Sequence, residues 1–544
     1  MLVYGDVETT KDAAALQASI LNSVASLATA PPGLDRHARL VSAFIEAGDL
    51  VCALIDRDGP DDLGMPALTA LARCVDISST SNFAVMGDLD AAAALLRAMP
   101  ASGTIRTKPA EGYAFYALYP ESYAEAARRS GLPPGTRVIG IRSIGTSLAA
   151  MVAAGLGADP PVTVRPVGHP FDRHVALDAQ ILVGDPPAFA VVDEGPGLSG
   201  SSFGAVIDWL TAHGVPPEAI HLFPSHSHGP GAQATEHRRH MWQAAPKHVV
   251  GFEDAILGGP LQAWVESIVG PLRAPLRDLS GGAWRELVSH DAPAAPSWER
   301  RKYLAETAGG RWLVKYAGLG PLAEHKLTLA HRLHAAGYGA EPAGLVHGLL
   351  VQRWLDCPNL LDAPLASDPL LRQLAAYLAF RASLTAPLDA GASPAKLVEM
   401  AIYNTTQTLG GEVAATLAQR LAAAPQEPPN RVHVDARLHR WEWLVDGDRL
   451  LKTDALDHAM AHDFIGAQPI EWDLAGAIVE HDLDPTRLLA AFAGASGRSV
   501  DVDRLDFYLP CYLAFQLGAW TMSSGGDAPE TRRYRNRLRR LLSC

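Results

Sequence analysis

Two adjacent acids, Asp193 and Glu194, follow the apolar run FAVV and precede the small-residue run GPGLSGSS. The next segment, FGAVIDWL, has the apolar periodicity of a helix. This order of strand, small-residue loop and helix start favours the binding of a phosphate. Backbone N–H groups, serine hydroxyls and the helix dipole all attract an anion. The acids are placed to accept hydrogen bonds from a diol or to hold a divalent cation. The residues expected to line this phosphate loop are Gly197, Ser199, Gly200, Ser201 and Ser202.

A second loop of the same kind lies upstream, in the run RVIGIRSIGTSLAAMVAAGL. Its pattern again predicts a strand, a turn and a helix, and therefore a second anion site. Arg142 opens the turn and can bind two phosphate oxygens at once. The turn residues expected to complete this site are Ser143, Gly145 and Thr146.

A phosphate beside a diol describes ribose 5-phosphate, and the two loops resemble those of the type I phosphoribosyltransferases, which act on 5-phosphoribosyl 1-diphosphate (PRPP). The resemblance implies that Asp193 and Glu194 are catalytic and hold the ribose hydroxyls. It also implies that residues 199–202 bind the 5′-phosphate, and that Arg142 and its turn bind the leaving pyrophosphate with Mg²⁺. The sequence departs from the family at Glu194, where a second Asp is commoner, and at 199–202, which replace a Thr/Gly run.

The stretch between the two loops, VTVRPVGHPFDRHVALDAQILVG, could form a strand pair with a mobile tip. It occupies the place of the family's flexible catalytic loop. Its basic residues would then close over the diphosphate; they are Arg165, His169, Arg173 and His174.

Downstream of the phosphate loop, His226 and His228 form an HxH pair just after the run IHLFPS. Such a pair can bind a metal or contact the acceptor, because functional residues collect where strands end. A polar loop of exposed histidines is the simpler interpretation, so the pair is not included among the predicted site residues.

A second group of residues that could take part in catalysis or binding lies after residue 300. Lys315 ends an apolar strand in GRWLVKYAG, and the run PLAEHKLTLAHRLHAAG predicts a helix with Glu324 near its start. Asp435 follows in RVHVDARLHRWEWL, and Asp454 ends the hairpin run LLKTD. This order resembles the aminoglycoside phosphotransferases and related small-molecule kinases. The resemblance implies that Lys315 pairs with Glu324 to hold the phosphates of ATP. It further implies that Asp435 is the base for the acceptor hydroxyl and that Asp454 binds Mg²⁺.

Two departures from that family leave an alternative open. No GxGxxG loop precedes Lys315, and Arg440 stands five residues after Asp435, where the family has a metal-binding Asn. His439 is the nearest substitute for that Asn. The lobe is therefore either an active phosphotransferase or a pseudokinase lobe that binds a nucleotide or a partner without chemistry.

Around these motifs the sequence predicts a helical N-terminal region over residues 1–105 and a phosphoribosyltransferase-like domain over 106–275. In the latter, the short runs RVIGIRS, VTVRPV, AQILVG, FAVVDE and IHLFPS alternate with helical segments, which favours an open, mostly parallel α/β sheet. A Gly-, Pro- and Ser-rich linker is expected over 276–300, and an α+β kinase-like domain of two lobes over 301–544.

Composition excludes several classes of protein. The 544 residues carry a net charge of −13, which argues against a nucleic-acid coat or a protein of anionic membranes. The longest nearly uncharged apolar stretch, 147–158, is shorter than the ~20 residues that a bilayer needs. The five cysteines include no CxxC pair and are expected to be reduced thiols. We therefore expect a cytoplasmic protein with a small-molecule substrate.

Together these patterns predict a bifunctional transferase for a small nucleotide- or ribose-related metabolite. It would transfer phosphoribosyl from PRPP at one site and a phosphoryl group from ATP at the other, with Mg²⁺ at both. One alternative is phosphorolysis or hydrolysis of a ribosyl phosphate compound, and another is a non-catalytic sensor of PRPP and nucleotides. The sequence does not specify the ribosyl acceptor, the reaction direction or the oligomeric state.

Overall fold

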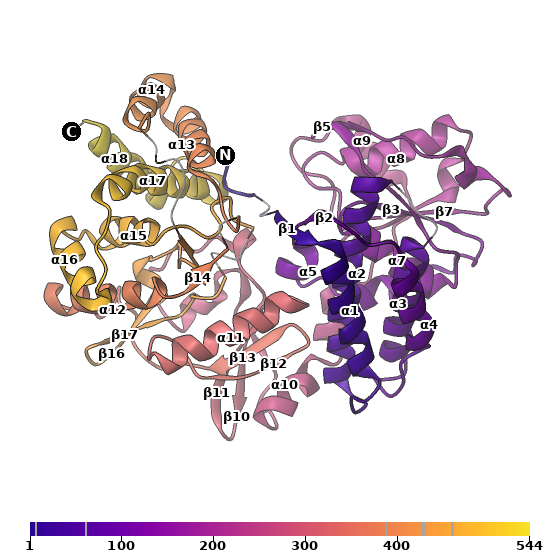
Figure 1. Cartoon of the computed structure of the whole chain (residues 1–544), viewed down its shortest axis with the longest axis horizontal. Coiled ribbons are helices and arrows are strands. Elements are labelled where there is room, and N and C mark those ends of the chain that lie inside the picture. Colours follow the sequence, from indigo (N-terminus) through magenta and orange to yellow (C-terminus); the bar gives the residue numbers. More distant parts are fainter. Residues whose placement is uncertain are drawn as a thin grey trace.

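The computed structural model has two halves that lie side by side (Figure 1). The first contains a parallel sheet covered by helices, and the second contains an antiparallel sheet beside a helical lobe. None of the described helices is long and apolar enough to cross a membrane. The structure describes residues 1–5, 8–59, 63–387, 389–423, 425, 430–457 and 462–543.

The sheet of the first half has four parallel strands in the order β4-β3-β7-β8. Successive residues of β7 point to opposite faces, and both faces are buried. Ala190 and Val192 pack in the same core as α7, whereas Phe189 and Val191 pack in the same core as α8. The predicted mixed α/β architecture with a parallel sheet is confirmed. These elements are β3 (Arg137–Ile141), β4 (Val162–Val164), β7 (Phe189–Val192), β8 (Ile220–Phe223), α7 (Gly145–Leu156) and α8 (Ser201–Ala212).

One predicted strand of this half is wrong. The run AQILVG forms a 3₁₀ helix at Ala179–Leu182. The Asp178 carboxylate accepts a hydrogen bond from the backbone N–H of Gln180 at 2.9 Å, which caps a helical turn. The predicted strand pair just upstream is confirmed as the hairpin of β5 (Val167–His169) and β6 (Asp172–His174).

A layer of helices covers the α7 face of the sheet. It comes from the first 105 residues, where a helical region is predicted, and it shares one hydrophobic core with α7. The chain enters and leaves this layer through two short paired strands, β1 (Thr9–Asp12) and β2 (Thr104–Thr107). The other helices of this half are α1 (Ala13–Leu27), α2 (Leu34–Asp58), α3 (Gly64–Thr80), α4 (Leu89–Ala98), α5 (Glu111–Phe115), α6 (Pro120–Ser130), α9 (Glu236–Ala244) and α10 (Leu261–Val269).

The second half begins with an antiparallel sheet of five strands in the order β12-β13-β11-β10-β9. The predicted hairpin at Gly309–Gly310 is present between β10 and β11. The first strand, β9, falls within the expected linker, so residues 276–300 contribute to this sheet. The elements are β9 (Arg277–Asp278), β10 (Lys302–Thr307), β11 (Gly310–Tyr316), α11 (Pro321–Ala335), β12 (Pro342–Val346) and β13 (Leu349–Arg353).

A helical lobe completes the second half, and residues 1–5 at the start of the chain lie against it. The backbone N–H of Leu2 donates to Asn404 Oδ1 at 2.7 Å, and the N–H of Phe464 donates to the carbonyl of Val3 at 2.9 Å. The elements of this lobe are α12 (Ser367–Arg381), β14 (Thr385–Ala386), α13 (Pro394–Leu409), α14 (Gly411–Arg420), β15 (Arg431–Val432), β16 (Trp443–Asp446), β17 (Arg449–Lys452), α15 (Glu471–His481), α16 (Pro485–Ser496), α17 (Val502–Ser524) and α18 (Pro529–Ser543).

Hydrogen bonds join the two halves. The hydroxyl of Tyr316 on β11 donates to the carbonyl of Tyr113 at 2.5 Å. The hydroxyl of Tyr119 donates to the carbonyl of His347 at 2.8 Å. Because both hydroxyls are buried and both partners are backbone groups, these bonds fix the five-stranded sheet against the first half.

Candidate active sites

A cavity of about 270 Å³ lies between the five-stranded sheet and the helical lobe. Lys315 and Asp454 both line it. Its wall includes Trp284 and Trp298 from the segment expected as a linker, so that segment covers the cleft. The structure thus brings two of the predicted nucleotide-site residues together in one cavity.

Lys315 is held by two carboxylates. It lies near the end of β11, and its Nζ is 2.8 Å from Asp454 Oδ1 and 2.5 Å from Asp457 Oδ2. Burial alone would lower the pKa of Lys315, but the two carboxylates raise it above its ordinary value. The lysine is therefore a fixed cation that faces the cavity. Asp457 is a site residue that the sequence analysis missed, although the spacing DxxD after LLKT contains it.

The predicted pair of Lys315 and Glu324 does not form. Glu324 is exposed at the start of α11, and Lys315 pairs with Asp454 and Asp457 instead. The residue that α11 turns inward is Lys326, whose side chain is 1% exposed and whose Nζ lies 2.6 Å from Asp457 Oδ1. The helix therefore contributes a second cation to this group where an acid was predicted.

Asp435 does not lie in the position expected for a catalytic base. Its side chain is fully buried. It accepts a hydrogen bond from the hydroxyl of Tyr377, and Arg381 Nη2 and Lys452 Nζ each lie 3.3 Å from one of its oxygens. Asp473 accepts from the backbone N–H of Asp435 at 2.7 Å, which fixes the loop. Asp435 is therefore held by buried partners and is not among the residues that line the cavity.

The phosphate loop of the first half forms a cradle that a hairpin covers. Gly200, with φ +68°, places Ser201 at the start of α8. The hydroxyls of Ser199 and Ser201 donate to the carbonyl of Pro170 at the tip of the β5–β6 hairpin, at 3.3 and 2.8 Å. Arg173 on β6 donates to Ser202 Oγ at 3.0 Å. The hairpin that was expected to cover the diphosphate thus lies on the loop that was expected to bind phosphate.

Asp193 and Glu194 lie together at the end of β7, half-buried. Asp193 Oδ1 accepts from the backbone N–H of Glu194 at 2.9 Å. Burial raises the pKa of Asp193 to about 7, and burial with the nearby acids Glu111 and Asp193 raises the pKa of Glu194 to about 8. Both groups therefore keep a proton up to near-neutral pH and would have to release it on binding a cation.

The second predicted loop is packed tightly at its helix end. Ser143 is half-buried, whereas Gly145 and Thr146 are buried. A side chain at Gly145 would meet the carbonyl of Val192 at 2.7 Å, so this glycine serves the packing of α7 on β7. Gly197, which belongs to the phosphate loop after β7, is exposed with φ +59°.

Arg142 is engaged by a residue that the sequence analysis did not select. Its Nε lies 3.0 Å from Asp56 Oδ1 on α2, and its Nη1 donates to Thr163 Oγ1 at 3.2 Å. Arg165 forms an ion pair with the same Asp56. The helical layer therefore supplies a carboxylate to the two arginines that were expected to bind the diphosphate.

Solved structures similar to about half of the chain are small-molecule kinases. A spectinomycin phosphotransferase in complex with ADP and spectinomycin is 13% identical, with a TM-score of 0.36, over 52% of this chain and 95% of that one. A macrolide 2′-phosphotransferase from Brachybacterium faecium is 16% identical, with a TM-score of 0.33, over 52% and 97%. A choline kinase from Streptococcus pneumoniae is 15% identical, with a TM-score of 0.33, over 44% and 89%. No family model matches the sequence, and no curated protein matches it.

Proposed function

We propose that the chain binds Mg·ATP in the cleft between the five-stranded sheet and the helical lobe and transfers a phosphoryl group to a hydroxyl of a small molecule. The observation that carries this proposal is the contact of Lys315 with Asp454 in the cavity. A buried ammonium group is a ligand for nucleotide phosphates, and a carboxylate oxygen beside it is a ligand for Mg²⁺. Asp454 is 33% exposed, so a cation can reach it.

The two carboxylates next to Lys315 have different roles in this proposal. Asp457 is 8% exposed and also binds Lys326, so it holds both lysines in place. Asp454 faces the cavity and would exchange part of its contact with Lys315 for Mg²⁺ when the nucleotide phosphates arrive. Phosphoryl transfer depends mainly on positioning and on charge stabilisation, so the burial of Asp435 does not exclude the reaction.

The apolar part of the cavity supports a nucleotide rather than a free phosphate. Leu313, Trp354 and Leu355 line the same cavity as Lys315. These side chains offer the flat apolar surface that a purine base requires, on the sheet side of the cleft.

Calorimetry with Mg·ATP, followed by an ADP-release assay with a metabolite extract as the acceptor pool, tests the proposal. Lys315→Met and Asp454→Asn should each weaken Mg·ATP binding at least tenfold, whereas Lys396→Met, at an exposed lysine of α13, should not. Absence of Mg·ATP binding to the unaltered chain would contradict the proposal. Binding without acceptor-dependent ADP release would favour the nucleotide sensor instead.

A second candidate function, phosphoribosyl transfer from PRPP, is supported by the cradle of Ser199, Ser201 and Ser202. Its hydroxyls surround the start of α8, Arg173 adds a positive charge, and Asp193 stands at the end of the neighbouring strand. This group could hold a 5′-phosphate and a ribose diol, with the hairpin tip moving off the serines when the phosphate enters.

Binding of Mg·PRPP and release of pyrophosphate test this second function. The double change Asp193→Asn with Glu194→Gln should reduce turnover about a hundredfold, which corresponds to ~3 kcal/mol of lost electrostatic stabilisation. Asp208→Asn on α8, whose side chain is 48% exposed, is the matched control. Reactions supplied with pyrophosphate, phosphate or water alone would distinguish transfer from phosphorolysis and hydrolysis. Unchanged turnover in the double variant would contradict the role of these acids.

A further inference from the structure

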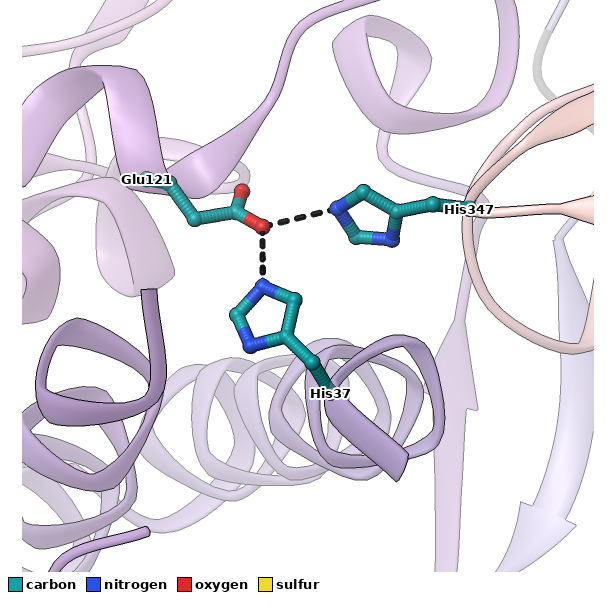
Figure 2. A group of neighbouring side chains, drawn as sticks. All are labelled: His37, Glu121 and His347. Atoms are coloured by element: carbon teal, nitrogen blue, oxygen red, sulfur yellow. Dashed lines mark hydrogen bonds and ion pairs between the residues drawn. The ribbon is translucent and has the colours of Figure 1, made fainter. Parts of the chain in front are cut away.

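Three side chains from distant parts of the chain meet at a buried point where the two halves join (Figure 2). His37 comes from α2, Glu121 from the first turn of α6, and His347 from the turn between β12 and β13. Glu121 Oε1 lies 2.7 Å from His37 Nε2 and 2.8 Å from His347 Nε2. The histidines are 1% and 2% exposed, so the meeting point is closed to bulk water.

The surroundings orient both imidazoles toward the carboxylate. His37 Nδ1 is 3.0 Å from Ser78 Oγ, and a hydrogen bond there leaves Nε2 free to act as a ligand. The backbone carbonyl of His347 accepts from Tyr119, and Trp264 packs against the His347 ring. A hydrogen bond behind a metal-binding imidazole is typical of protein metal sites, and His37 has one, whereas His347 Nδ1 is buried without a hydrogen-bond partner among the described residues.

No described lysine or arginine balances the carboxylate at this point. Within the described residues, no lysine or arginine forms an ion pair with Glu121, and its second oxygen, Oε2, is buried without a hydrogen-bond partner. A buried carboxylate is costly unless a cation or several hydrogen-bond donors compensate for it. Among the described residues this is also the one group of at least three His, Cys, Asp or Glu side chains close enough to share an ion.

We propose that His37, Glu121 and His347 bind one divalent transition-metal ion, for which Zn²⁺ is the best fit. Two imidazole nitrogens and one carboxylate match the ligands that Zn²⁺ takes, and Oε2 can complete the coordination. In tetrahedral zinc sites with metal–ligand bonds of ~2.0–2.1 Å the ligand atoms stand roughly 3.3 Å apart. Glu121 Oε1 therefore needs to move by only about half an ångström away from each histidine nitrogen.

Such an ion would join three segments that lie far apart in the sequence. Glu121 is 84 residues from His37 and 226 residues from His347. The ion would hold α2, α6 and the turn between β12 and β13 together at one point. Its role is then to fix the two halves relative to each other, and removing it should loosen the junction.

Metal analysis of the purified full chain tests the proposal. The chain purified without chelators should hold about one zinc ion, which a strong chelator removes, and returning Zn²⁺ should raise the melting temperature of the stripped protein. Co²⁺ added to the stripped chain should give the visible absorption of a four-coordinate site, and Zn²⁺ should abolish it. This readout uses the unaltered sequence and does not depend on whether a variant folds.

Substitutions locate the ion. Glu121→Gln and His347→Ala should each reduce bound zinc at least tenfold, whereas His331→Ala, at an exposed histidine of α11, should retain it. His226→Ala should also retain it, because His226 and His228 have no third ligand in a metal-binding group among the described residues. Failure of the chain to bind Zn²⁺ or Co²⁺ would overturn the proposal, as would full metal content in the Glu121 and His347 variants or its loss in the His226 variant.

Discussion

Asp457→Asn should destabilise the protein strongly, although Asp457 is not a predicted catalytic residue. The change removes the carboxylate that binds both Lys315 and Lys326. Lys315 keeps Asp454, but Lys326 has no other ion-pair partner among the described residues. Its ammonium group, with a side chain 1% exposed, is then a buried charge without compensation.

The cost can be worked out from that geometry. Breaking a buried ion pair by removing one partner costs about 3–5 kcal/mol. Burial already lowers the pKa of Lys326, and Asp457 opposes that shift, so the substitution lowers the pKa further. Since the unfolded chain then binds more protons than the folded one, the loss in the variant should shrink as pH rises, by up to about 1.4 kcal/mol per pH unit.

Urea unfolding of the unaltered chain and of three variants at pH 6 and pH 9 measures this. Lys326→Met should be close to neutral, because it removes the buried ammonium group while Asp457 keeps its contact with Lys315. The double change Lys326→Met with Asp457→Asn should recover most of the stability lost in Asp457→Asn alone. A loss below about 1 kcal/mol in Asp457→Asn, or additive losses in the double variant, would refute the reasoning.

Four further outcomes are expected. Asp454→Asn should change the free energy of unfolding by less than about 1 kcal/mol, since the residue is partly exposed, yet lower Mg·ATP affinity in calorimetry. Asp435→Asn should lower stability by about 3 kcal/mol or more in urea unfolding, because Arg381 loses its buried counter-ion while Lys452 keeps Glu442. It should leave nucleotide affinity within a few-fold. Asp193→Asn should stabilise the chain more at pH 8 than at pH 5. The folded state keeps the Asp193 proton up to a pKa of about 7, whereas the unfolded state releases it near pH 4. The free energy of unfolding of the unaltered chain therefore falls between these two pH values, by at most about 4 kcal/mol. Asp56→Asn should raise pyrophosphate affinity several-fold in calorimetry, because Asp56 competes with the anion for Arg142.

The sequence predicted correctly those parts of the fold that are determined by residues adjacent in the chain. The strand with Ala190 and Val192 reads as a continuous apolar run because both its faces are buried, and the turn at Gly309–Gly310 stands out by composition alone. The run AQILVG was misread because four of its six residues are apolar, while the deciding contact is the cap from Asp178.

The predicted pair of Lys315 and Glu324 does not form because Glu324 lies outside the face of α11 that is buried. Its buried residues are Ala323, Lys326, Leu329, Ala330 and Leu333, which form one helical stripe. Lys326 lies inside this stripe and Glu324 outside it, so the spacing in PLAEHKLTLAHRLHAAG already contained the answer. Asp56, in contrast, could not have been found, because only the tertiary fold brings α2 to Arg142.

One short helix contacts both candidate sites, although the sequence analysis assigns them to separate domains. The short helix α5 connects them: the backbone N–H of Gly112 in its first turn bonds the Glu194 carboxylate, and Tyr116 just after its end lines the cleft between the five-stranded sheet and the helical lobe. Glu111 at its start also lies 3.4 Å from His462 of the helical lobe. The same short helix therefore contacts Glu194 near its start and is followed at its end by a residue of the cleft wall.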